Sequence, residues 1–238
     1  MKVNLVKQDG LVCLKSLPSE SVNLLFTDPP YGTSRDEFAG SSGTKRKADG
    51  LCILHSDRPY IEYIKDILVE AKRVLKPDGS IIMFQGKQYI YETMHACPEL
   101  LFVDLIVYVQ GMRQHLAKTH LASAWTPILW FAKSKDYYSD AQSLRKYFKK
   151  EALGPKASIP DVWEDTRGMV QKYYSQKPLT ICRMVCELAC PKDGLIVDPF
   201  LGSGTAAEAA HLTGRRFIGC DVGDQAITAT KLRLAKYL

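Results

Sequence analysis

The stretch LIVDPFLGSGTAAEAAHLTGRRFIGCD, residues 195–221, decides the fold. It begins with a short apolar run that ends at Asp198 and continues through a loop with two glycines into an Ala-rich segment. It closes with a second apolar run, Arg216–Asp221. Short apolar runs without polar alternation are typical of strands that are covered on both faces. A strand, a glycine loop, a helix and a second strand in this order predict a βαβ unit of a parallel sheet.

The rest of the chain repeats this alternation. The pattern predicts further strands at Val3–Lys7, Val22–Thr27, Ser80–Phe84, Phe102–Val109 and Ile128–Ala132. It predicts helices at Tyr60–Leu75, Lys87–Ala96, Leu179–Cys190, Thr205–Thr213 and Asp224–Leu238. Turn signals with Pro and Gly follow the first and third of these helices. We therefore expect an α/β fold with one doubly wound, mostly parallel sheet, in a single domain over residues 1–238.

Two segments interrupt the alternation. Residues 32–58 are rich in Gly, Ser and charge, and a connection of this length is typical of a mobile functional loop or lid. Residues 133–175 are irregular and basic, and we expect both segments at or beside the carboxyl edge of the sheet. Within them, residues 133–150 carry six Lys or Arg against two Asp, with four aromatic residues between them. This pattern fits a solvated helix face and a phosphate-contacting surface equally well.

Bulk composition limits the class of protein. The hydrophobic fraction of 46% and the charged fraction of 24% are those of globular domains. No apolar run approaches the roughly 20 residues that cross a bilayer, and the first residues do not resemble a secretory signal. We expect a cytoplasmic protein of prokaryotic or phage origin, without a membrane partner. The net charge of +6 favours a polyanionic partner.

The seven cysteines are expected to be reduced in such a protein. Cys182, Cys186 and Cys190 recur every four residues, which places them on one face of a helix. A metal site is disfavoured because a CxxC pair and nearby histidines are missing, so we expect no metal and interpret these cysteines as small core residues.

The strand at Val22–Thr27 leads into Asp28-Pro29-Pro30-Tyr31. Two prolines make a rigid turn, but a turn alone explains neither the carboxylate before them nor the aromatic ring after them. The four residues fit methylation of an exocyclic amine, whose nitrogen is a poor nucleophile. Asp28 and the Pro29 carbonyl offer two fixed acceptors for the amine hydrogens, and Tyr31 offers a ring that stacks on an extruded base.

The loop Asp198-Pro199-Phe200-Leu201-Gly202-Ser203-Gly204-Thr205 is a candidate cofactor site, because glycines let the backbone approach a ligand at a helix start. It lacks the third glycine of GxGxxG and the Gly-Lys-Ser/Thr of a P-loop, which disfavours dinucleotides and ATP. Asp221 ends the following strand, where an acid can accept both hydroxyls of a ribose. Asp221 is equally suited to capping the helix that follows.

These motifs together resemble the amino-methyltransferases of DNA, the adenine N6 and cytosine N4 family. Asp28–Tyr31 is similar to the catalytic motif of that family, Asp198–Thr205 to its cofactor motif, and Phe217–Asp221 to its ribose-binding strand. The catalytic motif comes first here, as in the circularly permuted β class. The resemblance implies a Rossmann-like methyltransferase fold, S-adenosyl-L-methionine as cofactor and double-stranded DNA as substrate. It further allows a homodimer and a separately encoded restriction endonuclease as partners.

The resemblance also implies roles for individual residues. Asp9 would contact the cofactor adenine, Asp221 its ribose, and Asp198 its amino group. Gln176 and Lys177 would lie near its methionine carboxylate. Asp28 would border the cofactor as well as the base, and the remaining cofactor-binding residues would be Phe200, Gly202, Ser203, Gly204 and Thr205.

The chain departs from the family at three places, which bear on target recognition more than on the chemistry. Gln8 replaces a common Gly, residues 109–112 lack the usual Trp-x-Lys, and Thr126 stands where many relatives carry Glu. The target-recognition region is expected within residues 111–170. Asp at the first motif position favours adenine N6 as the methylated atom. Cytosine N4, an RNA substrate and an inactive DNA-binding module remain the alternatives.

Overall fold

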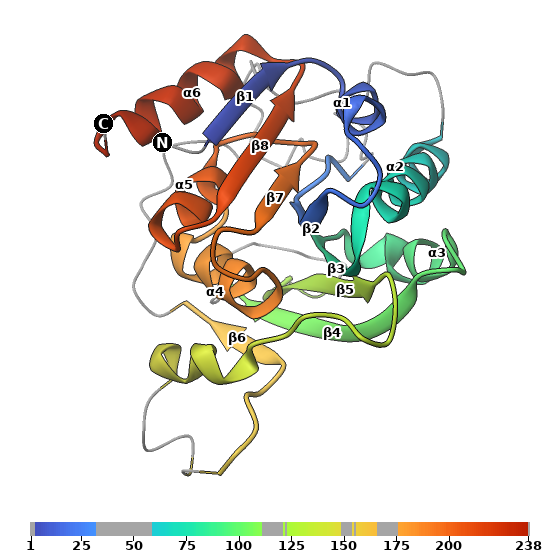
Figure 1. Cartoon of the computed structure of the whole chain (residues 1–238). Coiled ribbons are helices and arrows are strands. Elements are labelled where there is room, and N and C mark those ends of the chain that lie inside the picture. Colours follow the sequence, from blue (N-terminus) through green and yellow to red (C-terminus); the bar gives the residue numbers. More distant parts are fainter. Residues whose placement is uncertain are drawn as a thin grey trace.

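The computed structural model of the chain describes residues 3–31, 59–110, 121, 123–148, 154, 156–165 and 176–237. Its strands are β1 (Val3–Lys7), β2 (Val22–Thr27), β3 (Leu75–Phe84), β4 (Leu101–Val109), β5 (Trp125–Ala132), β6 (Val162–Glu164), β7 (Leu195–Asp198) and β8 (Arg216–Asp221). Its helices are α1 (Gly10–Ser16), α2 (Tyr60–Val74), η1 (Lys87–Tyr89), α3 (Ile90–His95), η2 (Ala141–Tyr147), α4 (Leu179–Ala189), α5 (Thr205–Leu212) and α6 (Asp224–Ala235). Figure 1 shows how they are arranged. Every strand and helix expected from the sequence is present, with ends that differ by a few residues.

The strands form one sheet in the order β1-β8-β7-β2-β3-β5-β4-β6. Strand β5 pairs antiparallel with β3 and with β4, and the other pairs are parallel. This confirms the expected α/β fold with a mostly parallel sheet. The last residues of β1, β8, β7 and β2 therefore meet along one side of the sheet, which we call the carboxyl edge. The opposite side is the amino edge.

Helices cover both faces of the sheet, because neighbouring strand residues point to opposite sides. In β3, Ile82 and Phe84 belong to the core under α4 and α5, whereas Ile81 and Met83 belong to the core under α2. Helices α4, α5 and α6 lie on one face, and α1, α2 and α3 lie on the other (Figure 1). This layering leaves the edges of the sheet for the loops.

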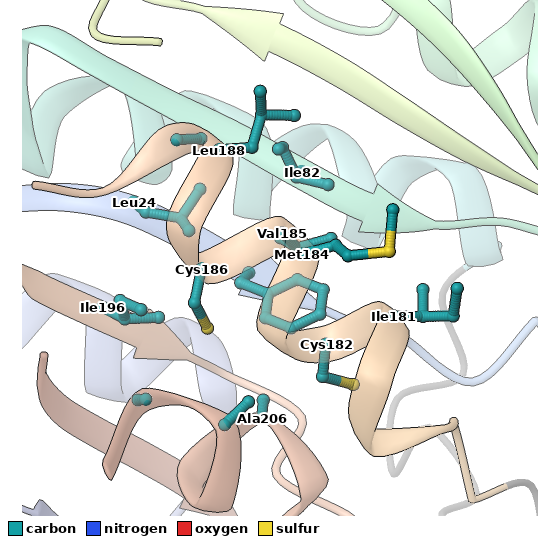
Figure 2. Close-up of a cluster of buried hydrophobic side chains, with 14 of the residues drawn as sticks. Leu24, Ile82, Ile181, Cys182, Met184, Val185, Cys186, Leu188, Ile196 and Ala206 are labelled. Carbon is teal, nitrogen blue, oxygen red and sulfur yellow. The ribbon is translucent and has the colours of Figure 1, made fainter. Parts of the chain in front are cut away.

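The cysteines of α4 lie in the first of these cores. Figure 2 shows Cys182 and Cys186 among apolar side chains of β2, β7 and α5. Both, and Cys190 after them, are buried and free, which confirms their interpretation as core residues. The expectation that all cysteines are reduced is wrong for one pair, because Cys13 and Cys220 form a disulfide between α1 and β8.

Three elements were not predicted from the sequence: α1, η2 and β6. The turn signal at residues 76–79 lies inside the bounds of β3, where the register against β2 shifts. The expectation that residues 133–175 lie at the carboxyl edge is wrong for their first part. Because β5 runs antiparallel, the chain leaves it at the amino edge, where the Lys133 N–H donates to the Gly79 carbonyl at 3.0 Å.

The expected loop at 32–58 lies outside the described residues, as does much of the proposed recognition region, including residues 111–120. Over the part of the chain that is described, no helix has the length and apolar character needed to span a membrane.

Candidate functional site

The tetrapeptide Asp28–Tyr31 and the glycine loop follow neighbouring strands of the sheet. Strand β2 pairs with β7, so Asp28 and Asp198 reach the carboxyl edge side by side. The Thr27 hydroxyl donates to Asp198 Oδ1 at 2.7 Å, and this contact is buried. Residues 171 positions apart in the chain are thus joined where the two motifs meet. A methyl group can pass between two sites only if they are adjacent in this way.

Both oxygens of the Asp28 carboxylate have partners. The Tyr31 hydroxyl donates to Oδ1 at 2.7 Å, and the Lys177 ammonium forms an ion pair with Oδ2. Burial and the nearby Asp28 charge raise the pKa of Tyr31 well above its ordinary value, so its hydroxyl stays protonated as a donor. Pro29 is buried and Pro30 is half-buried. Sequence reasoning predicted a stacking role for Tyr31 but missed its hydrogen bond to Asp28.

The glycine loop depends on backbone shapes that glycine adopts readily. Gly202 and Gly204 have φ angles of 49° and 72°, in the left-handed region. A Cβ at Gly204 would lie 2.3 Å from the buried Thr230 Oγ1, so no larger residue fits there. The Ser203 hydroxyl lies 3.0 Å from Thr205 Oγ1, at the start of α5. The loop is therefore shaped tightly at the helix start, as the sequence predicted.

Arg233 on α6 supports this loop from behind. Its Nε donates to the Ser203 carbonyl at 2.7 Å, and its Nη1 donates to the buried Glu208 carboxylate at 2.7 Å. No sequence pattern indicates this contact, since α6 reaches the loop only through the tertiary fold.

Asp198 is a buried carboxylate whose oxygen Oδ1 accepts two hydrogen bonds. The donors are the Thr27 hydroxyl and, at 3.0 Å, the Phe200 N–H. Burial raises the pKa of Asp198 to about 7, and the two hydrogen bonds oppose that rise. A positively charged ligand beside it would favour the ionised form.

Asp221 joins the end of β8 to the glycine loop. Its Oδ2 accepts from the Gly202 N–H at 3.0 Å, and its Oδ1 accepts from the Gly223 N–H at 2.8 Å. The residue that caps α6 is Gly223, so Asp221 shapes the turn before the helix. Each carboxylate oxygen has two lone pairs, which leaves Asp221 able to accept further hydrogen bonds.

Asp9 lies across from the glycine loop as the N-cap of α1. Its Oδ1 accepts from the Leu11 and Val12 N–H groups, and its Oδ2 accepts from the Tyr63 hydroxyl at 2.7 Å. A capping Asp before an apolar stretch is a helix-start signal, so α1 was predictable from the sequence.

The next residue brings the N-terminal segment against the cofactor motif. A Cβ at Gly10 would lie 2.5 Å from the Pro199 carbonyl oxygen, so the two backbones touch. On the same side, the rings of Tyr63 and Phe200 meet edge to face with centroids 6.1 Å apart. Tyr63, on α2, is a further site residue that the sequence did not reveal.

Gln176 and Lys177 lie just before α4, next to the catalytic motif. Lys177 reaches Asp28, and the buried Oε1 of Gln176 accepts no hydrogen bond from the described residues. The structure thus brings together every site residue that the sequence predicted: Asp9, Asp28, Pro29, Pro30, Tyr31, Gln176, Lys177, Asp198, Phe200, Gly202, Ser203, Gly204, Thr205 and Asp221.

Two of the positions that depart from the family meet at the neighbouring part of the same edge. Gln110, after β4, donates through Nε2 to the Thr126 hydroxyl on β5. Beside them the Lys87 ammonium lies 4.0 Å from the centre of the Trp125 ring. Of these departures, Gln110 and Thr126 are therefore in direct contact.

The chemistry of these residues fits S-adenosyl-L-methionine, which carries a positive sulfonium and a positive ammonium group. Four carboxylates gather at this edge, those of Asp9, Asp28, Asp198 and Asp221, around a loop built on glycines. No group of three or more His, Cys, Asp or Glu within the described ranges could hold a metal ion. These carboxylates and backbone groups suit a ligand that is an organic cation with hydroxyl groups.

Comparison with known proteins shows the family of the chain. The family model for DNA methylases of the N6/N4 type matches residues 22–232. The chain is 26% identical to the DNA adenine methyltransferase YhdJ of Escherichia coli K12, over 97% of this chain and 82% of that protein. It is 28% identical to the type II methyltransferase M2.DpnII of Streptococcus pneumoniae, over 98% and 90%.

Among solved structures, the fold is similar to that of the cytosine-N4-specific PvuII DNA methyltransferase. The TM-score is 0.77 at 16% identity, and the match covers 98% of this chain and 86% of that one. The chain therefore belongs to the N6/N4 DNA methylase family, the S-adenosylmethionine-dependent enzymes that methylate exocyclic amino groups of DNA bases.

Proposed function

We propose that the chain methylates the N6 atom of adenine in double-stranded DNA at a specific sequence. The observation that carries this proposal is the buried contact between Thr27 and Asp198, which sets the catalytic carboxylate beside the cofactor motif. Asp at the first motif position and the similarity to an adenine methyltransferase both support adenine as the target.

The residues around Asp28 supply what amine methylation needs. S-adenosyl-L-methionine, when bound, supplies a methyl group whose bond to a positive sulfur breaks with the electron pair left on the sulfur. The Asp28 carboxylate and the Pro29 carbonyl accept the two hydrogens of the amine, which makes its lone pair available to the methyl carbon. As the new carbon–nitrogen bond forms, one of these hydrogens leaves as a proton through Asp28 to solvent. Tyr31 stacks on the base, which has left the duplex.

The cofactor residues take separate parts of the ligand. In this proposal Asp198 faces its amino group, Asp221 its ribose and Asp9 its adenine. The glycine loop around Phe200 and Gly204 lies along the methionine and adenosine portions. Positive charge in the ligand explains why this edge carries four carboxylates.

Cytosine N4 is the second candidate base, favoured by the structural similarity to the PvuII enzyme. The same pair of acceptors suits either amine. We propose one methyltransferase domain, with target recognition within residues 111–170. The similarity to a type II methyltransferase also supports a separate restriction endonuclease as a partner, and a homodimer would help one small chain cover its site.

Mass analysis of nucleosides tests the proposal. The protein is incubated with DNA of random sequence and isotope-labelled S-adenosyl-L-methionine, the DNA is digested, and the labelled nucleosides are identified. We expect labelled N6-methyldeoxyadenosine and no label in RNA of the same sequence. Labelled N4-methyldeoxycytidine instead would show that cytosine N4 is the methylated atom. Label in RNA alone would overturn the proposal that DNA is the substrate. No label in any product, with the cofactor shown to bind, would favour an inactive DNA-binding module.

A further inference from the structure

Lys177 contacts the catalytic carboxylate directly. Its ammonium forms an ion pair with Asp28 Oδ2, and the two side chains are 11% and 25% exposed. Two charges so far withdrawn from water depend on each other, because removing one leaves the other buried without compensation. The ammonium also lies 4.9 Å from the centre of the Phe84 ring and 5.9 Å from that of Tyr31.

The backbone holds Lys177 in place. Pro178 follows it as the buried N-cap of α4, with φ −63°, and its carbonyl accepts from the Cys182 N–H at 3.1 Å. Helix α4 packs against β2, the strand that presents Asp28, and against β3, the strand that presents Phe84. The lysine and the carboxylate are therefore set by the same core.

The two partners of Asp28 contact different oxygens of its carboxylate. Lys177 holds Oδ2, and the Tyr31 hydroxyl holds Oδ1. A carboxylate oxygen has two lone pairs, so Oδ1 can accept a hydrogen of the amine beside the Tyr31 hydroxyl. Oδ1 is then the oxygen that faces the amine, while Oδ2 remains with the ammonium.

We propose that Lys177 is a positioning residue for methyl transfer, which fixes the Asp28 carboxylate so that Oδ1 receives the amine hydrogen. This inference rests on the proposed function. It differs from the role that the family resemblance implies, an anchor for the carboxylate of the cofactor. The two roles predict different defects: loss of positioning lowers kcat, and loss of an anchor raises the Kd of the cofactor.

The test compares three variants with the wild-type protein. Lys177→Met removes the charge at similar length, and Lys177→Arg keeps the charge. Lys133→Met is the matched control, because Lys133 is also a lysine of low exposure, 19%, ion-paired to Glu20 but at the amino edge. For each protein we measure kcat under saturating DNA and cofactor, the cofactor Kd by calorimetry, and the melting temperature.

We expect Lys177→Met to lower kcat by about 10- to 100-fold, as loss of a charge-assisted contact to a reacting group does, and to leave the cofactor Kd within about threefold. Lys177→Arg should recover part of kcat, and Lys133→Met should leave kcat unchanged. An unchanged kcat with a Kd raised tenfold or more in Lys177→Met would overturn the inference in favour of the anchor. If that variant does not fold, Lys177→Gln is measured against the same two outcomes.

A double variant separates the failure of this inference from that of the proposed function. If Lys177 acts through Asp28, Lys177→Met in an Asp28→Asn background should cost no further activity in single-turnover assays. A further loss as large as in the wild-type background would show an independent role and would overturn the inference. A wild-type protein that transfers no methyl group would count against the proposed function instead, whatever the variants bind.

Discussion

The two edges of the sheet both carry charged side chains, but they use them differently. At the amino edge, Lys133 donates to the Leu75 carbonyl at 2.7 Å, and the buried Arg215 donates to the Cys190 carbonyl at 2.7 Å. These cations satisfy carbonyl groups at the ends of strands and helices. At the carboxyl edge the charges are mainly carboxylates, and Asp198 is held there despite a burial that raises its pKa to about 7.

This difference indicates which edge is a site. The donors of Lys133 and Arg215 point at carbonyl groups of their own fold, whereas the carboxylates of Asp198 and Asp221 can accept more hydrogen bonds than the two each receives. A carboxylate kept in a buried place without a cation costs free energy, which a protein tolerates where function requires it. We therefore expect a cationic ligand to bind at the carboxyl edge, beside the carboxylates that can still accept hydrogen bonds.

The largest effect is expected from Asp28→Ala. It removes the carboxylate that we propose accepts a hydrogen of the amine, so methyl transfer should fall by about 1,000-fold, as for the loss of a key group that stabilises a transition state. Cofactor binding should change little, because the glycine loop and Asp221 are untouched. Turnover is measured with labelled cofactor, and binding by calorimetry. Turnover near the wild-type rate would remove Asp28 from the mechanism.

A smaller effect is expected from pH, through Asp198. A cationic ligand favours its carboxylate form, so the affinity for S-adenosyl-L-methionine should rise as the pH increases and level off above about 7. Below that value, the Kd should increase about tenfold for each unit of pH. Calorimetry between pH 5.5 and 8.5 measures this.

Asp198→Asn is the control for that titration, because it should bind the cofactor weakly and without the step near pH 7. Stability of the ligand-free protein gives a second measure. The folded pKa lies above the ordinary 3.8, so the folded state binds the extra proton between about pH 4 and 7. The contribution of Asp198 to the free energy of unfolding should therefore decrease as the pH rises through that window. A wild-type Kd that does not change with pH would contradict the placement of Asp198 beside a cation.

The carboxyl edge was largely predictable from the sequence, because its chemistry lies in short motifs at strand ends. Parallel strands end at the same side, so Asp28 and the loop after Asp198 had to share an edge once both were assigned to strand ends. What could not be read were the contacts that close the site from other elements, such as Tyr63 on Asp9 and Lys177 on Asp28. These depend on helix packing, which no local pattern encodes.

The amino edge was less predictable, because the antiparallel direction of β5 could not be read from the sequence. Residues after β5 look as basic and aromatic as a nucleic-acid surface, but the reversal of that strand sends them away from Asp28. Arg145 in this segment donates to the carbonyls of Ala157 at 2.7 Å and Gly154 at 2.6 Å. Composition indicates that the segment is basic, but only the strand topology shows at which edge of the sheet its charges lie.

The smallest effect is expected from Lys146→Met, in the middle of that basic segment. The Lys146 ammonium lies 2.7 Å from the Glu187 carboxylate, and helix η2 places both at the amino edge beside the end of α4. Its charge is already compensated by the Glu187 carboxylate, whose side chain is only 9% exposed, so the variant should affect the stability of the fold and not DNA binding. We therefore expect the Kd for duplex DNA to stay within about twofold and the salt dependence of binding to be unchanged. Both are measured by fluorescence anisotropy at several salt concentrations. A marked loss of affinity together with a shallower salt dependence would mean that Lys146 neutralises a phosphate, and the division between a binding edge and a structural edge would have to be redrawn.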